Sequence, residues 1–310
     1  MKKIAICLAL VMLLLAGCNQ RGPESRTILS MDTVMDISVW GEDQVTAADQ
    51  LEKLIRDLDA RWSATNVDSV TSQMNDQGTI LYMEDIRFLD QVEDLSERTD
   101  GAFDHMLHSV ISLWGFLDGD YRVPTAEELE IALNEEKWNL GAVVKGYTGR
   151  RAVELLKTLN VDRAVLNLGG NVQTYGTKAD GSPWIIGIQN PAGGNYVGTV
   201  SVTGTMAVVT SGDYQRYFEK DGVVYHHILD PKTGMPANNG LRSVTVICED
   251  GVVADALSTA LYVMGLEAAA DFWRESDDFE AVFILSDGSI YATEGANLSD
   301  CDFEVIRREN

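Results

Sequence analysis

Apolar and polar positions divide the chain into an uninterrupted apolar beginning and a longer part with regular periodicity. Residues 4–16 are apolar without a break, and they follow Lys2 and Lys3. A positive start before a short apolar run is typical of a secretory signal peptide, and the run is too short to cross a bilayer as a helix. We therefore expect the folded part of the protein to begin after this segment.

Helices are predicted where apolar residues recur every three or four positions. This spacing favours helices over 44–60, 85–98 and 146–160, and later over 252–264 and 266–274. Alternating apolar and polar positions predict strands instead. The predicted strands cover 27–40, 163–168, 184–189, 197–202, 207–210, 223–228, 242–248, 280–285 and 290–293.

The order of these elements indicates the fold class. Helices are concentrated early and strands late, without the regular alternation of a doubly wound sheet, so the pattern favours an α+β fold. The sequence contains no internal repeats, low-complexity blocks or long linkers. We predict one domain, with a division into two lobes as the open alternative.

The charge balance narrows the choice of ligands. The 310 residues include 45% apolar and 23% charged positions, which allows a substantial core, and the formal net charge is −24. So acidic a chain would repel a polyphosphate backbone, and nucleic acid is therefore excluded as an expected partner. A small anionic ligand would need a metal ion or a few well-placed cations.

The end of the apolar leader predicts a lipid anchor. Leu15-Ala16-Gly17-Cys18 resembles the bacterial lipobox, in which cleavage before the cysteine leaves a diacylated residue. We predict a signal peptide over 1–17, lipidated Cys18 with a tether over 18–26, and the folded domain over 27–310. The protein would then be extracytoplasmic and held at a bacterial cell membrane. A plain signal peptide with a chance cysteine is the alternative.

A polar stripe on the predicted helix 252–264 is the sharpest local signal. Asp255, Ser258, Thr259 and Tyr262 fall on one helix face. A carboxylate one turn away from two hydroxyls offers the hard oxygen ligands that Mg²⁺ prefers. The alternative is an ordinary amphipathic helix whose Asp255 forms a cap or an ion pair.

Three further segments carry candidate chemistry. In 139–147, two glycines and Lys145 lead into a helix, and backbone N–H groups at a helix start suit a phosphate. His226 and His227 adjoin at a strand end, where only one of them can face a given site. Phe103, Trp114 and Phe116 could stack on a planar ring. Each has a structural alternative: a loop with a solvent-exposed lysine, unremarkable histidines, and core aromatics.

Taken together and in order, these segments resemble the ApbE family of FAD:protein FMN transferases over about residues 31–285. The resemblance implies an ApbE-like, T-fold-related α+β domain that binds FAD and Mg²⁺, and family members are commonly lipoproteins. The matching runs are Asp-Gly-Ala-Phe-Asp (100–104), Leu-Trp-Gly-Phe (113–116), Leu-Gly-Ala-Val-Val-Lys-Gly-Tyr (140–147), Asn-Leu-Gly-Gly-Asn (167–171), Pro-Trp-Ile-Ile-Gly-Ile-Gln-Asn-Pro (183–191), Ser-Gly-Asp-Tyr (211–214), His-Ile-Leu-Asp-Pro-Lys-Thr-Gly (227–234) and Asp-Ala-Leu-Ser-Thr-Ala (255–260).

The resemblance also implies roles for individual residues. His227 matches the catalytic histidine, which would help to deprotonate a Thr or Ser hydroxyl of an acceptor protein, so that FMN is transferred and AMP released. The implied Mg²⁺ ligands are Asp255, Thr259, Ser258 and the main-chain oxygen of Ala142. The implied FAD contacts are Met31, Ala102, Phe103, Asp104, Asn139, Lys145 and Ile228.

Two positions depart from the family pattern. Asn139 stands where many relatives have an aspartate, and Asp32 stands in place of the glycine of a Met-Gly-Thr motif. Either could alter ligand affinity or metal preference. Three alternative functions stay open: an FAD pyrophosphatase that yields FMN and AMP, a flavin-binding or flavin-trafficking lipoprotein with little turnover, and an unrelated acidic surface lipoprotein.

Overall fold

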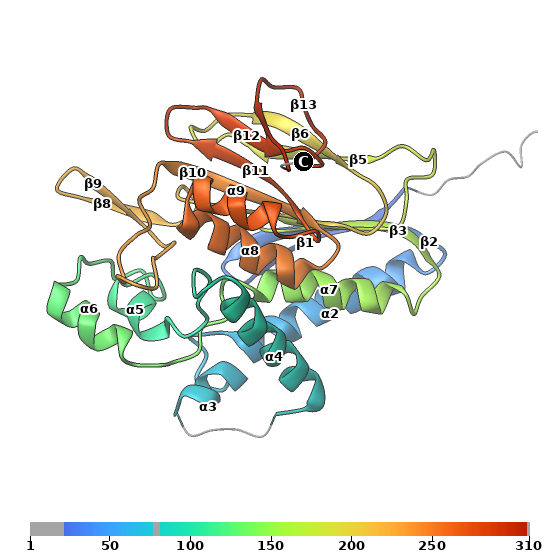
Figure 1. The fold of residues 1–310 in the computed structure, drawn as a ribbon. Helices are drawn as coiled ribbons and strands as arrows, with labels where there is room; N and C mark the ends of the chain where they lie inside the picture. Colours follow the sequence, from blue (N-terminus) through green and yellow to red (C-terminus); the bar gives the residue numbers. More distant parts are fainter. Residues whose placement is uncertain (1–21, 77–80, 309–310) are drawn as a thin grey trace, which may run out of the picture.

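One large sheet runs through the molecule (Figure 1). The computed structural model describes residues 22–76 and 81–308, so Cys18 and the predicted signal peptide lie outside the described residues. All neighbouring strands of this sheet are antiparallel except the last two, which are parallel. Their spatial order is β1 (Glu24–Ser30), β2 (Thr33–Gly41), β3 (Val161–Leu168), β4 (Asn171–Tyr175), β7 (Ala207–Gly212), β10 (Leu241–Cys248), β11 (Glu280–Leu285), β12 (Ile290–Thr293) and β14 (Glu304–Ile306).

A small sheet covers one face of the large sheet. Its strands are β13 (Leu298–Ser299), β6 (Tyr196–Val202) and β5 (Trp184–Gln189), in that spatial order. Side chains from both sheets form one buried cluster between them, because alternate residues of each strand point inward. Trp184 and Val200 come from the small sheet, and Val208 and Ile284 come from the large one.

Helices cover the opposite face of the large sheet (Figure 1). They are α2 (Gln44–Trp62), α7 (Val144–Leu156), α8 (Gly251–Met264) and α9 (Leu266–Arg274). The apolar stripe of α2, including Leu51 and Ile55, is fully buried against β1 and β2. α8 is buried on nearly all sides, because it lies between the sheet and the neighbouring helices α7 and α9.

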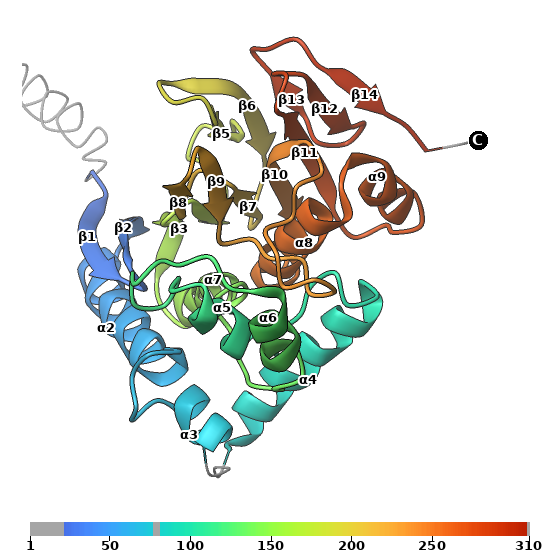
Figure 2. The same ribbon diagram turned by 90° about the vertical axis from the view of Figure 1, so that its left-hand side faces the viewer.

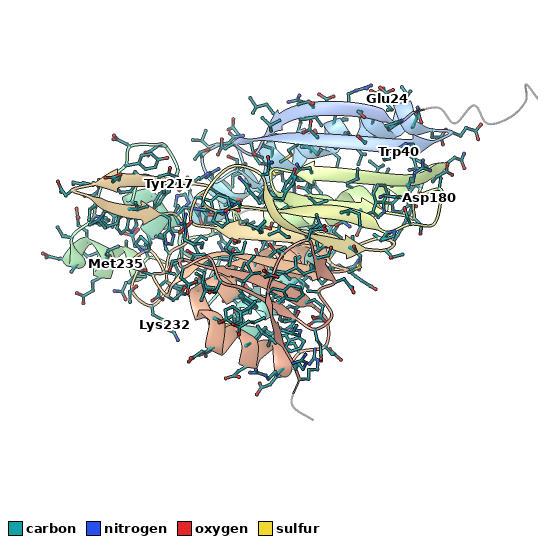
Figure 3. The ribbon with its side chains drawn as sticks, turned by 90° about the horizontal axis from the view of Figure 1, so that it is seen from above. Glu24, Trp40, Asp180, Tyr217, Lys232 and Met235 are labelled. Carbon is teal, nitrogen blue, oxygen red and sulfur yellow. The ribbon has the colours of Figure 1, made fainter. Side chains whose placement is uncertain are left out.

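The remaining helices lie beyond this layer. α3 (Val70–Asp76) and α4 (Met83–Arg98) lie below α2 in Figure 1, and α5 (His108–Leu113) and α6 (Ala126–Leu133) lie at one end. A two-stranded hairpin, β8 (Tyr217–Lys220) and β9 (Val223–His226), lies at that same end (Figures 1 and 2). Phe218 and Tyr225 of the hairpin pack with Trp114 and Phe116, which follow α5. Figure 3 shows Tyr217 at this end and Glu24 at the opposite end.

The structure confirms the α+β class in a single domain and corrects several boundaries. The helix 266–274 and the strands 280–285 and 290–293 have the predicted limits. The single strand predicted over 27–40 is wrong: Met31 and Asp32 have φ of 50° and 56° and form the turn between β1 and β2.

Other predicted limits need smaller corrections. Because β1 begins at Glu24, residues 24–26 belong to the sheet and not to the tether. The strand predicted to reach residue 228 ends at His226. The pattern missed α3, α5, α6, β4, β8, β13 and β14. Within the described ranges, none of the helices combines the length and the hydropathy that a bilayer crossing needs.

Candidate functional site

A cavity of about 570 Å³ gathers most of the residues to which the sequence points. Its wall combines the first turn of α7, one side of α8, the β1–β2 turn and both ends of the β8–β9 hairpin. The volume falls within the range of pockets that bind small molecules. The predicted site residues in this wall are Met31, Asp104, Asn139, Ala142, Lys145, His227, Ile228, Asp255 and Thr259.

Three predicted site residues lie elsewhere. Phe103 is 1% exposed and belongs to the core cluster around α4 and α7. Ala102 lines a separate surface groove, which shares Pro231 with the cavity. Ser258 is fully buried behind the wall. Of the aromatic side chains that could have stacked on a ring, Phe103 and Trp114 are core residues, and Phe116 alone lines the cavity.

His227 is held in a defined tautomer directly after β9. Its backbone N–H donates to the carbonyl oxygen of Arg216 at 3.1 Å, and its ring Nδ1 lies 3.2 Å from the same oxygen. A carbonyl can only accept, so Nδ1 carries the proton and Nε2 is left with a lone pair. Burial, with the cations Arg216 and Lys145 nearby, lowers the pKa of His227 to about 3. The ring is therefore a neutral base near neutral pH.

His226 points away from this site, as the alternation of strand residues requires. It is 7% exposed, does not line the cavity, and packs edge-on against Tyr262 with ring centroids 5.7 Å apart. Burial also lowers the pKa of His226. Only His227 is placed to act on a ligand in the cavity.

Lys145 lies in the first turn of α7 and lines the cavity. Two N–H groups of this helix start are already bonded, that of Val144 to the Leu140 carbonyl oxygen at 2.9 Å and that of Gly146 to Asp255 Oδ2 at 2.7 Å. Burial lowers the pKa of Lys145, and the nearby carboxylate of Asp255 opposes that shift. The ammonium group of Lys145, together with the positive end of the helix dipole, makes this part of the wall a suitable phosphate-binding surface.

The polar stripe of α8 is buried, not solvent-exposed. Asp255 Oδ2 accepts the backbone N–H of Gly146 at 2.7 Å, and burial raises the pKa of Asp255. Ser258 Oγ lies 2.9 Å from the Asp255 carbonyl oxygen and 2.7 Å from Ser211 Oγ. Thr259 lines the cavity, and its hydroxyl lies 3.3 Å from Ser211 Oγ. The stripe is therefore not that of an exposed amphipathic helix.

Some of the predicted oxygen ligands are placed to bind a divalent cation, and one is not. Asp255, Thr259 and Ala142 line one cavity, and carboxylate, hydroxyl and carbonyl oxygens are the donors that Mg²⁺ takes. A cation would also stabilise a carboxylate that burial alone disfavours. The buried hydroxyl of Ser258 is engaged with protein atoms and fits only as a support. Over the described ranges there is no group of three or more His, Cys, Asp or Glu side chains suited to a metal, and Asp255 is the one carboxylate among the three donors named here.

The loop before α7 is shaped by Asn139. Its Oδ1 accepts the N–H of Gly141 at 3.0 Å, and its buried Nδ2 has no hydrogen-bond partner within the described part of the chain. Asn139 is 8% exposed and lines the cavity, so this donor is available to a ligand. Met31 also lines the cavity, and its N–H donates to Asp59 Oδ2 at 2.9 Å.

Close packing of α7 on α8 positions Asp255. A Cβ atom on Gly146 would lie 2.0 Å from the Gly251 carbonyl oxygen and 2.8 Å from Asp255 Cβ. We expect Gly146→Ala to lower the free energy of unfolding by about 1–3 kcal/mol, the usual cost of overpacking. Gly149→Ala is the matched control, because its Cβ would meet only the Gln173 side chain, at 3.1 Å. Urea unfolding of both variants tests this, and equal stability would contradict the packing argument.

Sequence reasoning missed Arg216 and the wall formed by residues 59–65. Arg216 lines the cavity, and its carbonyl oxygen fixes His227. One signal was available: in so acidic a chain, Arg216 is a cation two positions after the Ser-Gly-Asp-Tyr run 211–214. Residues 59–65 come from the end of α2 and the following loop, and nothing in their pattern marks them.

Comparison with known proteins identifies the family. The model of the ApbE family matches residues 31–283. Among curated relatives, the FAD:protein FMN transferase of Klebsiella pneumoniae is 33% identical over 234 residues, covering 67% of this chain and 72% of that protein. The FAD:protein FMN transferase of Treponema pallidum is 30% identical over 314 residues, covering 87% of each.

Solved structures agree with the sequence comparison. The ApbE protein of Thermotoga maritima superposes with a TM-score of 0.81 at 32% identity, covering 88% of this chain and 97% of that one. The apo form of the flavinyl transferase ApbE of Pseudomonas stutzeri gives 0.77 at 28% identity, covering 88% and 95%. The fold and these comparisons define an α+β enzyme of the transferase class. The chain belongs to the ApbE family.

Proposed function

We propose that this chain is a Mg²⁺-dependent FAD:protein FMN transferase, which moves FMN from FAD to a Thr or Ser hydroxyl of an acceptor protein and releases AMP. One observation carries the proposal. His227, with an unprotonated Nε2, shares a single cavity with the phosphate-binding surface around Lys145 and with Asp255. The two curated relatives, both FAD:protein FMN transferases, support the same activity.

The cavity supplies the binding and orientation that the reaction needs. Lys145, at the start of α7, would bind the diphosphate, and the buried amide of Asn139 would donate to the ligand. Asp255, Thr259 and the Ala142 carbonyl would hold Mg²⁺, which when bound offsets negative charge on phosphate oxygens. These few positive groups would allow a protein of net charge −24 to bind a dinucleotide.

Proton transfer is assigned to His227. Its Nε2 would accept the proton of the acceptor hydroxyl as that oxygen attacks the FMN phosphorus. The bond between this phosphorus and the bridging oxygen of the diphosphate breaks, and AMP leaves with that oxygen. The Arg216 carbonyl holds the Nδ1 proton and so keeps the ring in the tautomer that the step requires.

The membrane location is part of the proposal. The lipobox-like Leu15-Ala16-Gly17-Cys18 would place the enzyme outside the cytoplasm on a lipid anchor, near acceptors such as subunits of membrane redox complexes. Cys18→Ser should move the protein from the membrane fraction to the soluble fraction. Unchanged membrane retention of that variant would remove the lipid anchor from the proposal.

An assay with FAD, Mg²⁺ and an acceptor domain carrying a Thr tests the function. Flavin fluorescence that stays with the acceptor in a denaturing gel, together with AMP release, is the expected result. Free FMN plus AMP would instead identify a pyrophosphatase, and bound but intact FAD would identify a carrier. No FAD binding at all would reject the flavin assignment.

A further inference from the structure

An ion pair lies in the cavity wall at the position where this chain departs from the Met-Gly-Thr pattern. Arg216 Nη2, at the start of the β8–β9 hairpin, lies 3.2 Å from Asp32 Oδ2, in the β1–β2 turn. Both residues line the cavity. Among the described residues, no other ion pair has both members in this wall. The pair therefore links two elements of the site that are far apart in sequence.

The cavity wall has few positive charges, so the pairing of one of them affects how the cavity binds an anion. Over the described part of the chain, the lining contains only two Lys or Arg side chains, Lys145 and Arg216. Four carboxylates, of Asp32, Asp59, Asp104 and Asp255, line the same space. An incoming diphosphate thus meets an excess of negative charge, and one of the two cations is already paired.

The other three carboxylates have structural tasks. Asp59 Oδ2 accepts from the Ser30 hydroxyl and the Met31 N–H, Asp104 Oδ1 accepts the Met106 N–H, and Asp255 Oδ2 accepts the Gly146 N–H. Within residues 22–76 and 81–308, the side chain of Asp32 pairs with Arg216 alone. Asp32 also has a φ of 56°, a conformation that glycine adopts without cost, so the side chain is what this position gains over a glycine.

Arg216 can leave Asp32 for a phosphate group at little cost. The side chain of Asp32 is 82% exposed and that of Arg216 is 41% exposed, and exposed ion pairs contribute little. A guanidinium binds phosphate oxygens through two parallel hydrogen bonds, which is a stronger arrangement than a single contact with one carboxylate oxygen. Arg216 lines the same cavity as Lys145 and His227, and its carbonyl oxygen lies 3.2 Å from His227 Nδ1.

We propose that Arg216 is a further ligand of the FAD diphosphate and that Asp32 competes with the diphosphate for it. In the empty site Arg216 pairs with Asp32, and on loading the guanidinium transfers to phosphate oxygens while Asp32 turns to solvent. Asp32 thereby weakens FAD binding and favours exchange of the anionic products. This inference rests on the proposed function, because it takes FAD as the substrate.

Four variants separate this exchange from a general charge effect. Asp32→Asn removes the charge but keeps a residue type that tolerates positive φ. Asp221→Asn is the matched control, because Asp221 is also exposed, has a φ of 54° and lies in the turn of the same hairpin, away from the cavity. Arg216→Gln removes the cation but keeps the backbone carbonyl that holds His227. The double variant Asp32→Asn with Arg216→Gln completes a cycle.

The readout is FAD binding followed by flavin fluorescence in EDTA, which prevents Mg²⁺-dependent turnover, with riboflavin as a phosphate-free probe. We expect Asp32→Asn to tighten FAD binding about 2–5-fold and Arg216→Gln to weaken it about 10-fold or more. The double variant should match Arg216→Gln alone, and riboflavin binding should not change. The tightening by Asp32→Asn should shrink in high salt.

Contrary outcomes are equally specific. Asp32→Asn behaving like Asp221→Asn, or still tightening FAD binding when Arg216 is absent, would overturn the exchange. If the wild-type protein transfers FMN but Asp32→Asn leaves FAD affinity unchanged, this inference alone is wrong. If FAD binding and the variant effects are as expected but the wild-type protein never labels an acceptor, the proposed function is wrong and the exchange of Arg216 between Asp32 and the diphosphate still holds. Wild-type protein that binds no FAD overturns both.

Discussion

Asp255→Ala is expected to abolish FMN transfer, with a fall in kcat of about 10³-fold or more. Asp255 is the one carboxylate among the oxygens that would hold Mg²⁺, and stabilisation of phosphoryl charge by a metal is worth several kcal/mol. The same change removes the acceptor of the Gly146 N–H at the start of α7. The loss should therefore affect both the metal and the phosphate-binding surface.

Two measurements separate loss of the metal from loss of the fold. The wild-type protein should gain thermal stability on addition of Mg²⁺, as any ligand of the native state provides, and Asp255→Ala should gain none. Asp250→Asn is the control, because Asp250 caps the same helix through the Val252 N–H at 2.8 Å, a task that asparagine also performs. Undiminished FMN transfer by Asp255→Ala, or unchanged stabilisation by Mg²⁺, would refute the metal assignment.

Local periodicity predicted the parts of the site that are carried by one element. The spacing of Asp255, Ser258 and Thr259 placed these side chains on one face of a helix, and α8 has that face. The alternation along β9 correctly separated His226 from His227. Both predictions follow from the 3.6-residue period of a helix and the two-residue period of a strand, so they can be made without knowing the rest of the fold.

Burial and long-range pairing could not be predicted in the same way. Nothing in the pattern of α8 shows that the sheet covers its polar stripe. The pattern therefore makes Ser258 a candidate ligand, although its hydroxyl is buried against Ser211. The Arg216–Asp32 pair joins residues 184 positions apart in the sequence. The turn at Met31 and Asp32 was missed because positive φ is expected of glycine, and neither residue is one.

The second large effect is expected at His227. His227→Ala should lower kcat about 10²–10⁴-fold, the usual contribution of a general base, while FAD binding changes far less. The backbone N–H of residue 227 still donates to the Arg216 carbonyl in this variant, so the local chain path should persist. Single-turnover transfer to the acceptor, beside FAD titration, separates the two quantities.

His226→Ala is the matched control for that result. His226 is the adjacent imidazole, but it packs against Tyr262 outside the cavity. Its loss should lower the melting temperature through lost core packing and leave kcat nearly unchanged. Equal losses of kcat in both variants would mean that the ring of His227 has no special role.

The pH dependence gives an independent test of His227. Because its pKa is lowered to about 3 in the folded protein, the ring stays neutral and able to accept a proton throughout pH 5–8. In the unfolded chain the pKa of His227 returns to its ordinary value of 6.5, so the unfolded state binds one more proton than the folded state between pH 6.5 and pH 3. His227 therefore lowers the free energy of unfolding as pH falls through this range, and the loss stops growing near pH 3. The profile of kcat/KM should therefore show no acid limb near 6.5 that depends on His227. A loss of kcat/KM below pH 6.5 that persists in Arg216→Gln but disappears in His227→Ala would contradict this prediction. It would show that the ring of His227 takes up a proton near pH 6.5 and is not held neutral by the Arg216 carbonyl.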